Sequence, residues 1–121
     1  MIQAHWGQVA PYNRTTNLIS VPETAGIYCL LVQYRNGSYG LCYVGQADNL
    51  RERLYDHQQL LEPNEGIRTY LSQYVLKAVW IQVPVAENRD AIELYLYNTY
   101  KPSLNKQMPP GNKMLAVTVC W

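Results

Sequence analysis

The sequence has no phenylalanine, although tyrosine occurs 11 times among its 121 residues. Tyrosines must therefore provide much of the aromatic packing, and any single tyrosine is first expected to be a core residue whose hydroxyl reaches water. Apolar residues make up 48% of the chain and charged residues 16%, which is the composition of an ordinary globular protein. The length predicts one domain around a single core.

Long apolar runs are also absent. No segment is long enough to span a membrane, and residues 1–14 lack the apolar stretch of a secretory signal. The three cysteines, Cys29, Cys42 and Cys120, are an odd number, and no further ligands stand at the spacing of a zinc site. We therefore expect a cytoplasmic protein without membrane contact, whose reduced cysteines serve as small buried hydrophobic residues.

Acidic residues are absent after Glu93, whereas Lys101, Lys106 and Lys113 follow it. Over the whole chain, 10 basic residues balance 9 acidic ones to give a net charge of +1. Bulk charge therefore does not indicate a nucleic-acid-binding protein. The distribution fits either a local basic strip in the C-terminal part or an ordinary solvated tail.

What the sequence does contain is a hairpin signal. Two apolar, β-favouring segments at residues 25–34 and 39–45 flank the dipeptide Asn36-Gly37. This dipeptide between apolar segments is typical of a two-residue hairpin turn. Such a turn pairs Arg35 with Ser38 and fixes the register of both strands.

The predicted register brings two tyrosines together. It pairs Leu30 with Tyr43, and because strand side chains alternate between faces, Tyr28 and Tyr43 lie on one face as diagonal neighbours. The same register places Cys29 and Cys42 on the opposite face. A change of one residue in the loop would separate the two tyrosines.

The rest of the chain predicts three helices and one strand. Asp48 is expected to cap a helix that runs to about residue 61, with Leu54 and Leu61 on its apolar face. The remaining elements are a short helix at 67–74, a strand at 75–83 and a helix at 87–100 capped by Asn88.

Both faces of the hairpin carry apolar side chains, so the sheet needs cover on both sides. We predict an α/β (α+β) fold with a small three-stranded antiparallel or mixed sheet flanked by helices on both faces. Residues 1–24 are expected to form an arm packed on the domain, residues 25–106 the domain itself, and residues 107–121 a tail or an added strand. Glu93 is unusual because an unpaired carboxylate on an otherwise apolar helix is costly.

The ordered motifs resemble a known family. Gly-Ile-Tyr at residues 26–28, Tyr-Val-Gly at 43–45 and the segment that follows at 46–54 are similar to the GIY-YIG nuclease superfamily, as a single-domain member. That family includes phage homing endonucleases, some restriction enzymes and the catalytic domain of a bacterial nucleotide-excision repair subunit. The resemblance covers roughly residues 25–105, and the motifs depart from the family only at Val44, where the family has isoleucine.

The resemblance implies a GIY-YIG endonuclease fold and a catalytic set. The family's arginine on the helix after the second motif corresponds to Arg53, and its histidine one turn later corresponds to His57. Its metal-binding glutamate corresponds to Glu93, and its late asparagine after a proline corresponds to Asn105. With the two motif tyrosines, the implied catalytic residues are Tyr28, Tyr43, Arg53, His57, Glu93 and Asn105.

The implied activity is hydrolysis of DNA phosphodiester bonds by a metal-dependent endonuclease. Glu93 would hold one Mg²⁺ or Mn²⁺, Arg53 would stabilise the phosphate charge, and Tyr28 and His57 would activate water. DNA, including branched or damaged DNA, is the implied partner, and a targeting protein or a second copy of the chain are further candidates. Gly45, Gln46, Arg51 and Lys106 are expected to contact the substrate.

The sequence leaves two questions open. Tyr28 as the base would need a pKa about three units below its usual value of about 10, which corresponds to roughly 4 kcal/mol, with His57 or Tyr43 accepting its proton. His57 alone is the alternative base because its usual pKa already suits the task. A non-catalytic nucleic-acid-binding module and a protein-interaction domain on the same fold are the alternatives to an enzyme.

Overall fold

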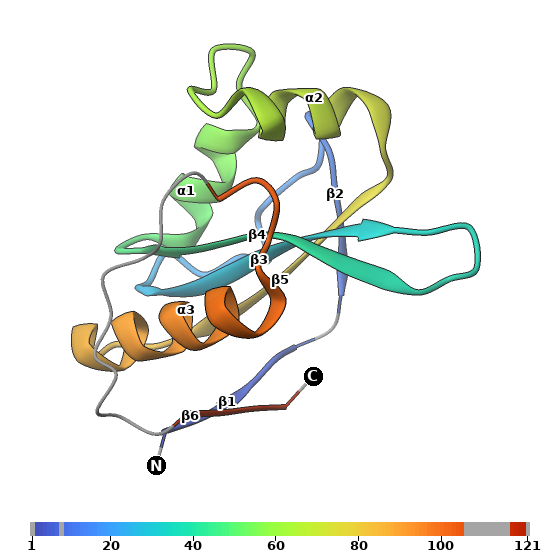
Figure 1. Cartoon of the computed structure of the whole chain (residues 1–121). Coiled ribbons are helices and arrows are strands. Elements are labelled where there is room, and N and C mark those ends of the chain that lie inside the picture. The colour runs from blue at the N-terminus through green and yellow to red at the C-terminus, as the bar shows by residue number, and fades with distance from the viewer. Residues whose placement is uncertain (1, 8, 106–116, 121) are drawn as a thin grey trace.

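The computed structural model describes residues 2–7, 9–105 and 117–120 (Figure 1). In chain order the elements are β1 (Ile2–His5), β2 (Ala10–Tyr12), β3 (Gly26–Gln33), β4 (Tyr39–Ala47), α1 (Leu50–His57), α2 (Glu65–Gln73), β5 (Leu76–Gln82), α3 (Ala86–Tyr100) and β6 (Val117–Cys120). No helix among the described residues is long and apolar enough to cross a membrane.

The central sheet has four antiparallel strands in the order β2-β5-β3-β4. The predicted fold class is therefore confirmed, with one more strand than expected, because β2 pairs with the free edge of β5. β4 forms the other edge. Strands β1 and β6 pair in parallel as a separate two-stranded sheet, which lies beside α3, away from the central sheet (Figure 1).

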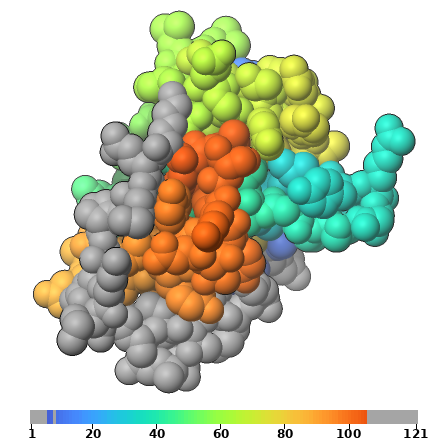
Figure 2. Space-filling model, in the orientation of Figure 1, coloured from blue at the N-terminus to red at the C-terminus, as the bar shows by residue number. Residues whose placement is uncertain are grey.

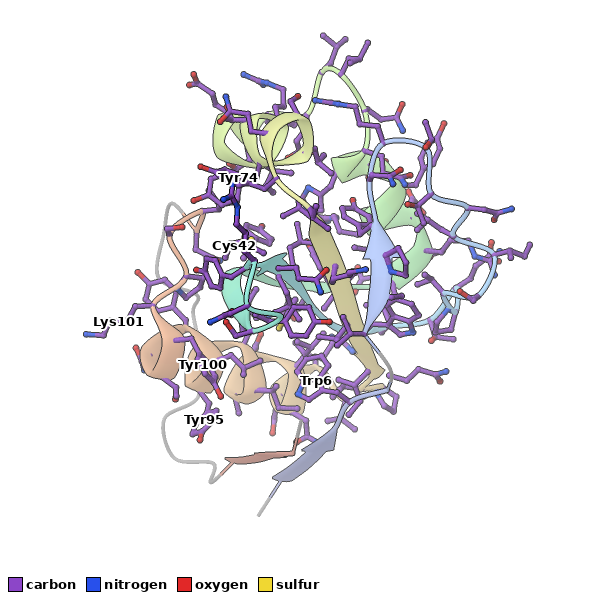
Figure 3. All side chains as sticks on the ribbon, turned by 90° about the vertical axis from the view of Figure 1, so that its right-hand side faces the viewer. Trp6, Cys42, Tyr74, Tyr95, Tyr100 and Lys101 are labelled. Atoms are coloured by element: carbon purple, nitrogen blue, oxygen red, sulfur yellow. The ribbon has the colours of Figure 1, made fainter. Side chains whose placement is uncertain are left out.

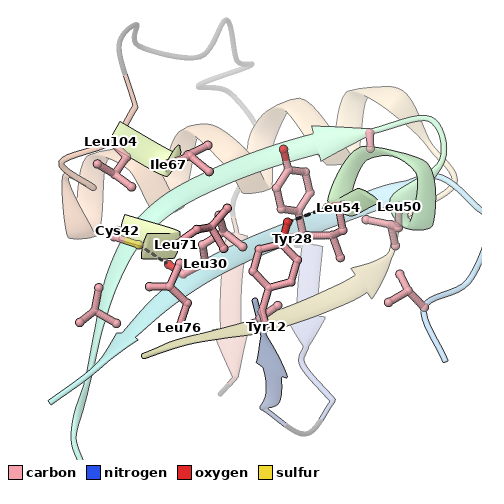
Figure 4. Close-up of a cluster of buried hydrophobic side chains, with 14 residues drawn as sticks. Tyr12, Tyr28, Leu30, Cys42, Leu50, Leu54, Ile67, Leu71, Leu76 and Leu104 are labelled. Carbon is pink, nitrogen blue, oxygen red and sulfur yellow. Dashed lines mark hydrogen bonds between the residues drawn. The ribbon is translucent and has the colours of Figure 1, made fainter. Parts of the chain in front are cut away.

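Helices cover both faces of the central sheet, as the apolar residues on both faces of the hairpin predicted. One core lies between the sheet and helices α1 and α2 (Figure 4), and the other lies between the sheet and α3. The first core includes Tyr12, Tyr28, Leu30, Leu50, Leu54, Ile67 and Leu71. The second includes Ile27, Cys29, Leu31, Val44, Val79, Ile92 and Leu96.

The hairpin turn differs from the prediction, although the register at the tyrosines does not. Tyr34 pairs with Ser38 through the Tyr34 N to Ser38 O hydrogen bond of 2.9 Å, so three residues form the loop rather than two. Gly37 has φ +87°, as expected for the last residue of a three-residue hairpin loop. The longer loop shifts the outer part of the hairpin by one residue.

A β-bulge in β4 reverses that shift. The register changes between the Leu30 and Leu31 pairs, so that Leu31 faces Leu41 whereas Leu30 faces Tyr43, as predicted. The extra residue is Cys42, which lies in the first core with its thiol donating to Leu30 O (3.2 Å). The prediction that Cys29 and Cys42 share a face was therefore wrong, because a bulge was not foreseen.

The ends of the helices also differ in detail. The N-cap of α1 is Asn49 rather than Asp48, because the Asn49 side chain accepts the hydrogen bond from Glu52 N. This helix ends at His57, so Leu61 is 91% exposed instead of lying on the apolar face. The N-cap of α3 is Val85 rather than Asn88, without a side-chain capping bond.

Gly45 is a glycine because Tyr28 lies against it. The two residues pair across β3 and β4, and a Cβ added to Gly45 would lie 2.5 Å from both Cζ and the hydroxyl of Tyr28. A buried ring held in a packed core cannot move aside easily. This contact gives a physical reason for the last residue of the second motif.

We expect Gly45→Ala to lower the free energy of unfolding by about 2–3 kcal/mol, because overpacking a buried site costs this much. Urea denaturation followed by circular dichroism measures the change. Gly7→Ala is the matched control, since nothing lies within 4 Å of a Cβ at Gly7. Equal stability of the two variants would show that the Tyr28 ring moves freely and would contradict the packing argument.

Candidate active site

Three rings meet where β3, β4 and α1 converge. The Tyr28 hydroxyl lies 2.6 Å from His57 Nε2. The Tyr43 ring centroid is 6.0 Å from that of Tyr28 and 5.4 Å, edge-on, from that of His57. The predicted placement of the two tyrosines on one face is thus confirmed, and α1 brings His57 against them.

Glu62 joins this group from the loop after α1. Its Oε1 lies 3.2 Å from His57 Nδ1, although the direction of the ring N–H is not that of a regular hydrogen bond. Both side chains are buried, and Asn64 N donates to the same carboxylate oxygen (3.2 Å). Glu62 therefore favours the tautomer with the proton on Nδ1, which leaves Nε2 free to accept from Tyr28.

The sequence did not indicate this contact of Glu62, because the residue lies between the helix predicted to end near residue 61 and the helix predicted at residues 67–74. The available signal was its position five residues after His57, just beyond a helix end. A chain that reverses direction there can return a side chain to the last turn of the helix.

Burial sets the protonation of the rings. It raises the pKa of Tyr28 well above its usual value, and the neighbouring Tyr43 adds to this, whereas Arg53 opposes it. Burial lowers the pKa of His57, partly offset by Glu62. Both groups are therefore neutral near pH 7, with Tyr28 a donor and His57 an acceptor.

Arg53 supplies the positive charge of the site. It lies one turn before His57 on α1, so both project from one side of the helix. Its side chain is exposed, and within the described part of the chain its guanidinium has no hydrogen-bond or ion-pair partner. Its charge acts on the group nonetheless, because it lowers the pKa of Tyr28, Tyr43 and His57.

Glu93 provides the negative charge, from α3. It is 8% exposed, and the Gln46 side chain links it to Asp90: Nε2 donates to Glu93 Oε1 (3.0 Å) and to Asp90 Oδ1 (2.7 Å). Burial raises the pKa of Glu93, the Gln46 hydrogen bond lowers it, and Asp90 raises it. Burial raises the pKa of Tyr43, the neighbouring Tyr28 lowers it, and the charge of Glu93 raises it. This last effect connects Glu93 to the ring cluster.

The carboxylate oxygens of Glu93 and Asp90 are ligands that suit a hard divalent cation. A buried carboxylate close to a second one is stabilised when a cation offsets their repulsion. No group of three or more His, Cys, Asp or Glu residues suited to a metal occurs in the described ranges. An ion on Glu93 would therefore keep most of its ligands as water, as Mg²⁺ commonly does.

Three of the other predicted site residues make structural contacts. Asn105 pairs with the backbone of Val44 on the edge strand: Oδ1 accepts from Val44 N (3.0 Å) and Nδ2 donates to Val44 O (2.8 Å). Arg51 donates to Val21 O (2.8 Å) and forms further bonds to the N-terminal arm. Gly45 accommodates the Tyr28 ring. Lys106 lies outside the described residues.

Comparison with known proteins identifies the family. The family model described as the GIY-YIG catalytic domain matches residues 24–107. Among curated proteins, the chain is similar to UvrABC system protein C of Wolbachia pipientis subsp. Culex pipiens (strain wPip), with 29% identity over 103 residues. The match covers 83% of this chain but 16% of that protein, about a sixth of its length, and no solved structure matches. The chain therefore belongs to the GIY-YIG family of catalytic domains.

Proposed function

We propose that this chain is a metal-dependent endonuclease that hydrolyses phosphodiester bonds of DNA. The observation that carries the proposal is the chain of contacts from Tyr43 through Tyr28 and His57 to Glu62, with the charges of Arg53 and Glu93 acting on it from two sides. A binding module needs neither a buried proton acceptor nor a buried carboxylate.

Water activation follows from the hydrogen-bond chain. Tyr28 takes the proton of the attacking water as it gives its own proton to His57 Nε2. A free phenolate is avoided, which matters because burial raises the pKa of Tyr28. Glu62 then stabilises the imidazolium that forms on His57, as a carboxylate does in other histidine relays. Tyr43, whose ring contacts that of Tyr28 and which is only half-buried, orients the water.

Arg53 acts on the phosphate. Its planar guanidinium donates to two oxygens at once and offsets the negative charge that grows during the attack. Mg²⁺ or Mn²⁺, held by Glu93 when bound, would polarise the phosphate oxygens. Gln46 keeps the Glu93 carboxylate oriented, and Asn105 fixes the strand segment that carries Tyr43.

The choice of substrate depends on more than this site. A net charge of +1 gives weak overall attraction to DNA. We therefore propose that branched or damaged DNA is selected by its structure, or that a targeting protein or a second copy of the chain brings this domain to its substrate.

The test is nicking of supercoiled plasmid by the purified chain with Mg²⁺ or Mn²⁺. We expect nicking that EDTA abolishes and that Arg53→Ala reduces about 100-fold, since loss of one stabilising donor costs about this much. Arg53→Lys should retain an intermediate rate because it keeps the charge without the planar fork. Glu52→Gln, an exposed change on the same helix, is the control. Salt-sensitive binding to DNA without cleavage of plasmid, branched or single-stranded DNA would overturn the proposal.

A further inference from the structure

A second feature lies further along β4 and α3, which carry Gln46 and Glu93. It lies near the hairpin loop and the C-terminal end of α3. A cavity of about 610 Å³ opens between the outer part of the β3–β4 hairpin and the C-terminal end of α3. Three of its lining residues are tyrosines, Tyr34, Tyr39 and Tyr100, and they are 54%, 44% and 44% exposed. We call this cavity the tyrosine groove. Figure 2 shows the end of α3 (orange) next to the hairpin (cyan) on the face in view.

The hairpin geometry builds the groove. The bulge at Cys42 turns Leu41 into the core beneath α3, and Tyr39, two residues away on the strand, joins it in lining the groove. The Tyr34 ring lies over Gly40, where an added Cβ would be 2.5 Å from its hydroxyl. This contact restricts the Tyr34 ring, so little further side-chain entropy of Tyr34 is lost when a ligand binds against it.

The charged residues next to the lining tyrosines in the sequence are basic. The segment from residue 24 to residue 47 contains no acidic residue, and none follows Glu93. Arg35 follows Tyr34 at the hairpin tip, and Lys101 follows Tyr100 and points outward at the end of α3 (Figure 3). Lys77 pairs with Leu31, a lining residue, and so stands on the same face. Basic side chains next to aromatic rings suit a nucleic acid, which is a polyanion that carries flat bases, better than an apolar protein surface.

The groove continues from the proposed active site. Tyr100 lies seven residues after Glu93 on α3, which is two helical turns along the same face, or about 10 Å. A nucleic-acid strand held at Glu93 can therefore reach the groove within about three nucleotides, at 3.4 Å per stacked nucleotide.

We propose that the tyrosine groove binds two or three unstacked nucleotides of a single-stranded segment next to the bond that is cut. Bases stack on Tyr39 and Tyr100, while Arg35, Lys77 and Lys101 neutralise phosphates. A duplex cannot bind in this way because its bases already stack on one another. The place of this segment relative to the cut rests on the proposed function, whereas binding itself does not.

The test is the affinity for a fluorescein-labelled ten-nucleotide oligothymidylate, measured by fluorescence anisotropy in EDTA so that no cleavage occurs. We expect Tyr39→Ala and Tyr100→Ala each to weaken binding about 5- to 150-fold, since one stacked base contributes this much. Tyr100→Phe should keep the wild-type affinity because it keeps the ring face. The matched control is Tyr95→Ala, on the same helix and 39% exposed, but outside the groove. Lys101→Asn, which tolerates the left-handed backbone of that residue, should lower the salt slope by about 0.7.

The outcomes separate this proposal from the endonuclease proposal. If Tyr39→Ala and Tyr100→Ala bind the oligothymidylate with wild-type affinity, the groove proposal is overturned. The endonuclease proposal is unaffected by this result and depends on the plasmid assay. An equal loss of affinity for a ten-base-pair duplex would also overturn it. A wild-type chain that binds the oligothymidylate through these tyrosines but never nicks DNA would leave the groove standing and overturn the endonuclease.

Discussion

Replacing Glu93 by glutamine is expected to reduce metal-dependent cleavage about 1000-fold, while the metal-free protein becomes more stable. Cleavage falls because an amide is a poor ligand for Mg²⁺ or Mn²⁺, whose contribution is worth several kcal/mol, and each 1.36 kcal/mol is tenfold in rate. Stability rises because the buried carboxylate near Asp90 is disfavoured when charged. Glutamine still offers an oxygen to Gln46 Nε2, so the local hydrogen bond is kept.

The pH dependence tests the same point. Because the folded-state pKa of Glu93 is raised, the folded protein binds more protons than the unfolded chain just above pH 4.5. Wild-type stability is therefore lost as pH rises through that window, and Glu93→Gln removes the loss. Thermal melts in EDTA should show the variant more stable by a few degrees at pH 7 and equal to wild type near pH 4.

Glu87→Gln is the control for both measurements, because it makes the same charge change at an exposed position of the same helix. It should leave cleavage, Mn²⁺ affinity by calorimetry, and the melting temperature near wild type. Wild-type Mn²⁺ affinity in Glu93→Gln would rule out Glu93 as the metal ligand. A melting temperature of Glu93→Gln below that of the wild type would show that the charged Glu93 carboxylate does not destabilise the metal-free protein.

Removing the Tyr28 hydroxyl is the second change with a large expected effect. Tyr28→Phe should lower kcat about 1000-fold, within the range of general acid–base catalysis, because the proton path from water to His57 is broken. Tyr12→Phe is a closely matched control: Tyr12 is another buried tyrosine of the same core, and its hydroxyl donates to Leu54 O (2.6 Å; Figure 4). That control should lose about 1 kcal/mol of stability but keep its activity.

The pH profile of cleavage distinguishes a relay from a packing role. His57 must be neutral to accept the proton, and burial lowers its pKa, so the rate should fall on the acid side below pH 6.5. Glu62 raises the pKa of His57, so in Glu62→Gln this fall should move to lower pH while the maximum rate decreases. A Tyr28→Phe enzyme with nearly full activity would leave His57 as the direct base. If the rate of Glu62→Gln falls at the same pH as that of the wild type, Glu62 does not act on the pKa of His57.

The strongest local signals of the sequence predicted the fold and the position of the tyrosines. The Asn36-Gly37 turn between two apolar segments predicted the correct pairing of Leu30 with Tyr43, but through two errors that cancel. Asn-Gly indicates a tight turn without fixing whether two or three residues form it. A bulge leaves no signature in an apolar strand.

The roles of polar residues were harder to predict, because they depend on which backbone groups the fold leaves unpaired. Asn105 could be expected in the site, but its amide satisfies Val44 on an open sheet edge. Arg51 and Arg53 lie two residues apart on one helix, yet Arg51 reaches carbonyl groups of the arm whereas Arg53 faces solvent. Strand β2 contains a proline, which argues against a central strand but suits an edge.

The bulge at Cys42 also divides the hairpin into two parts that can vary separately. The inner part carries Tyr28 and Tyr43, and the outer part carries Tyr34 and Tyr39. One residue gained or lost at the loop shifts the outer pairing, and a movable bulge can absorb that shift before it reaches the inner pairing. A change of loop length then leaves Tyr28 and Tyr43 in place, so that the proposed tyrosine groove and the proposed cleavage site can change independently of each other.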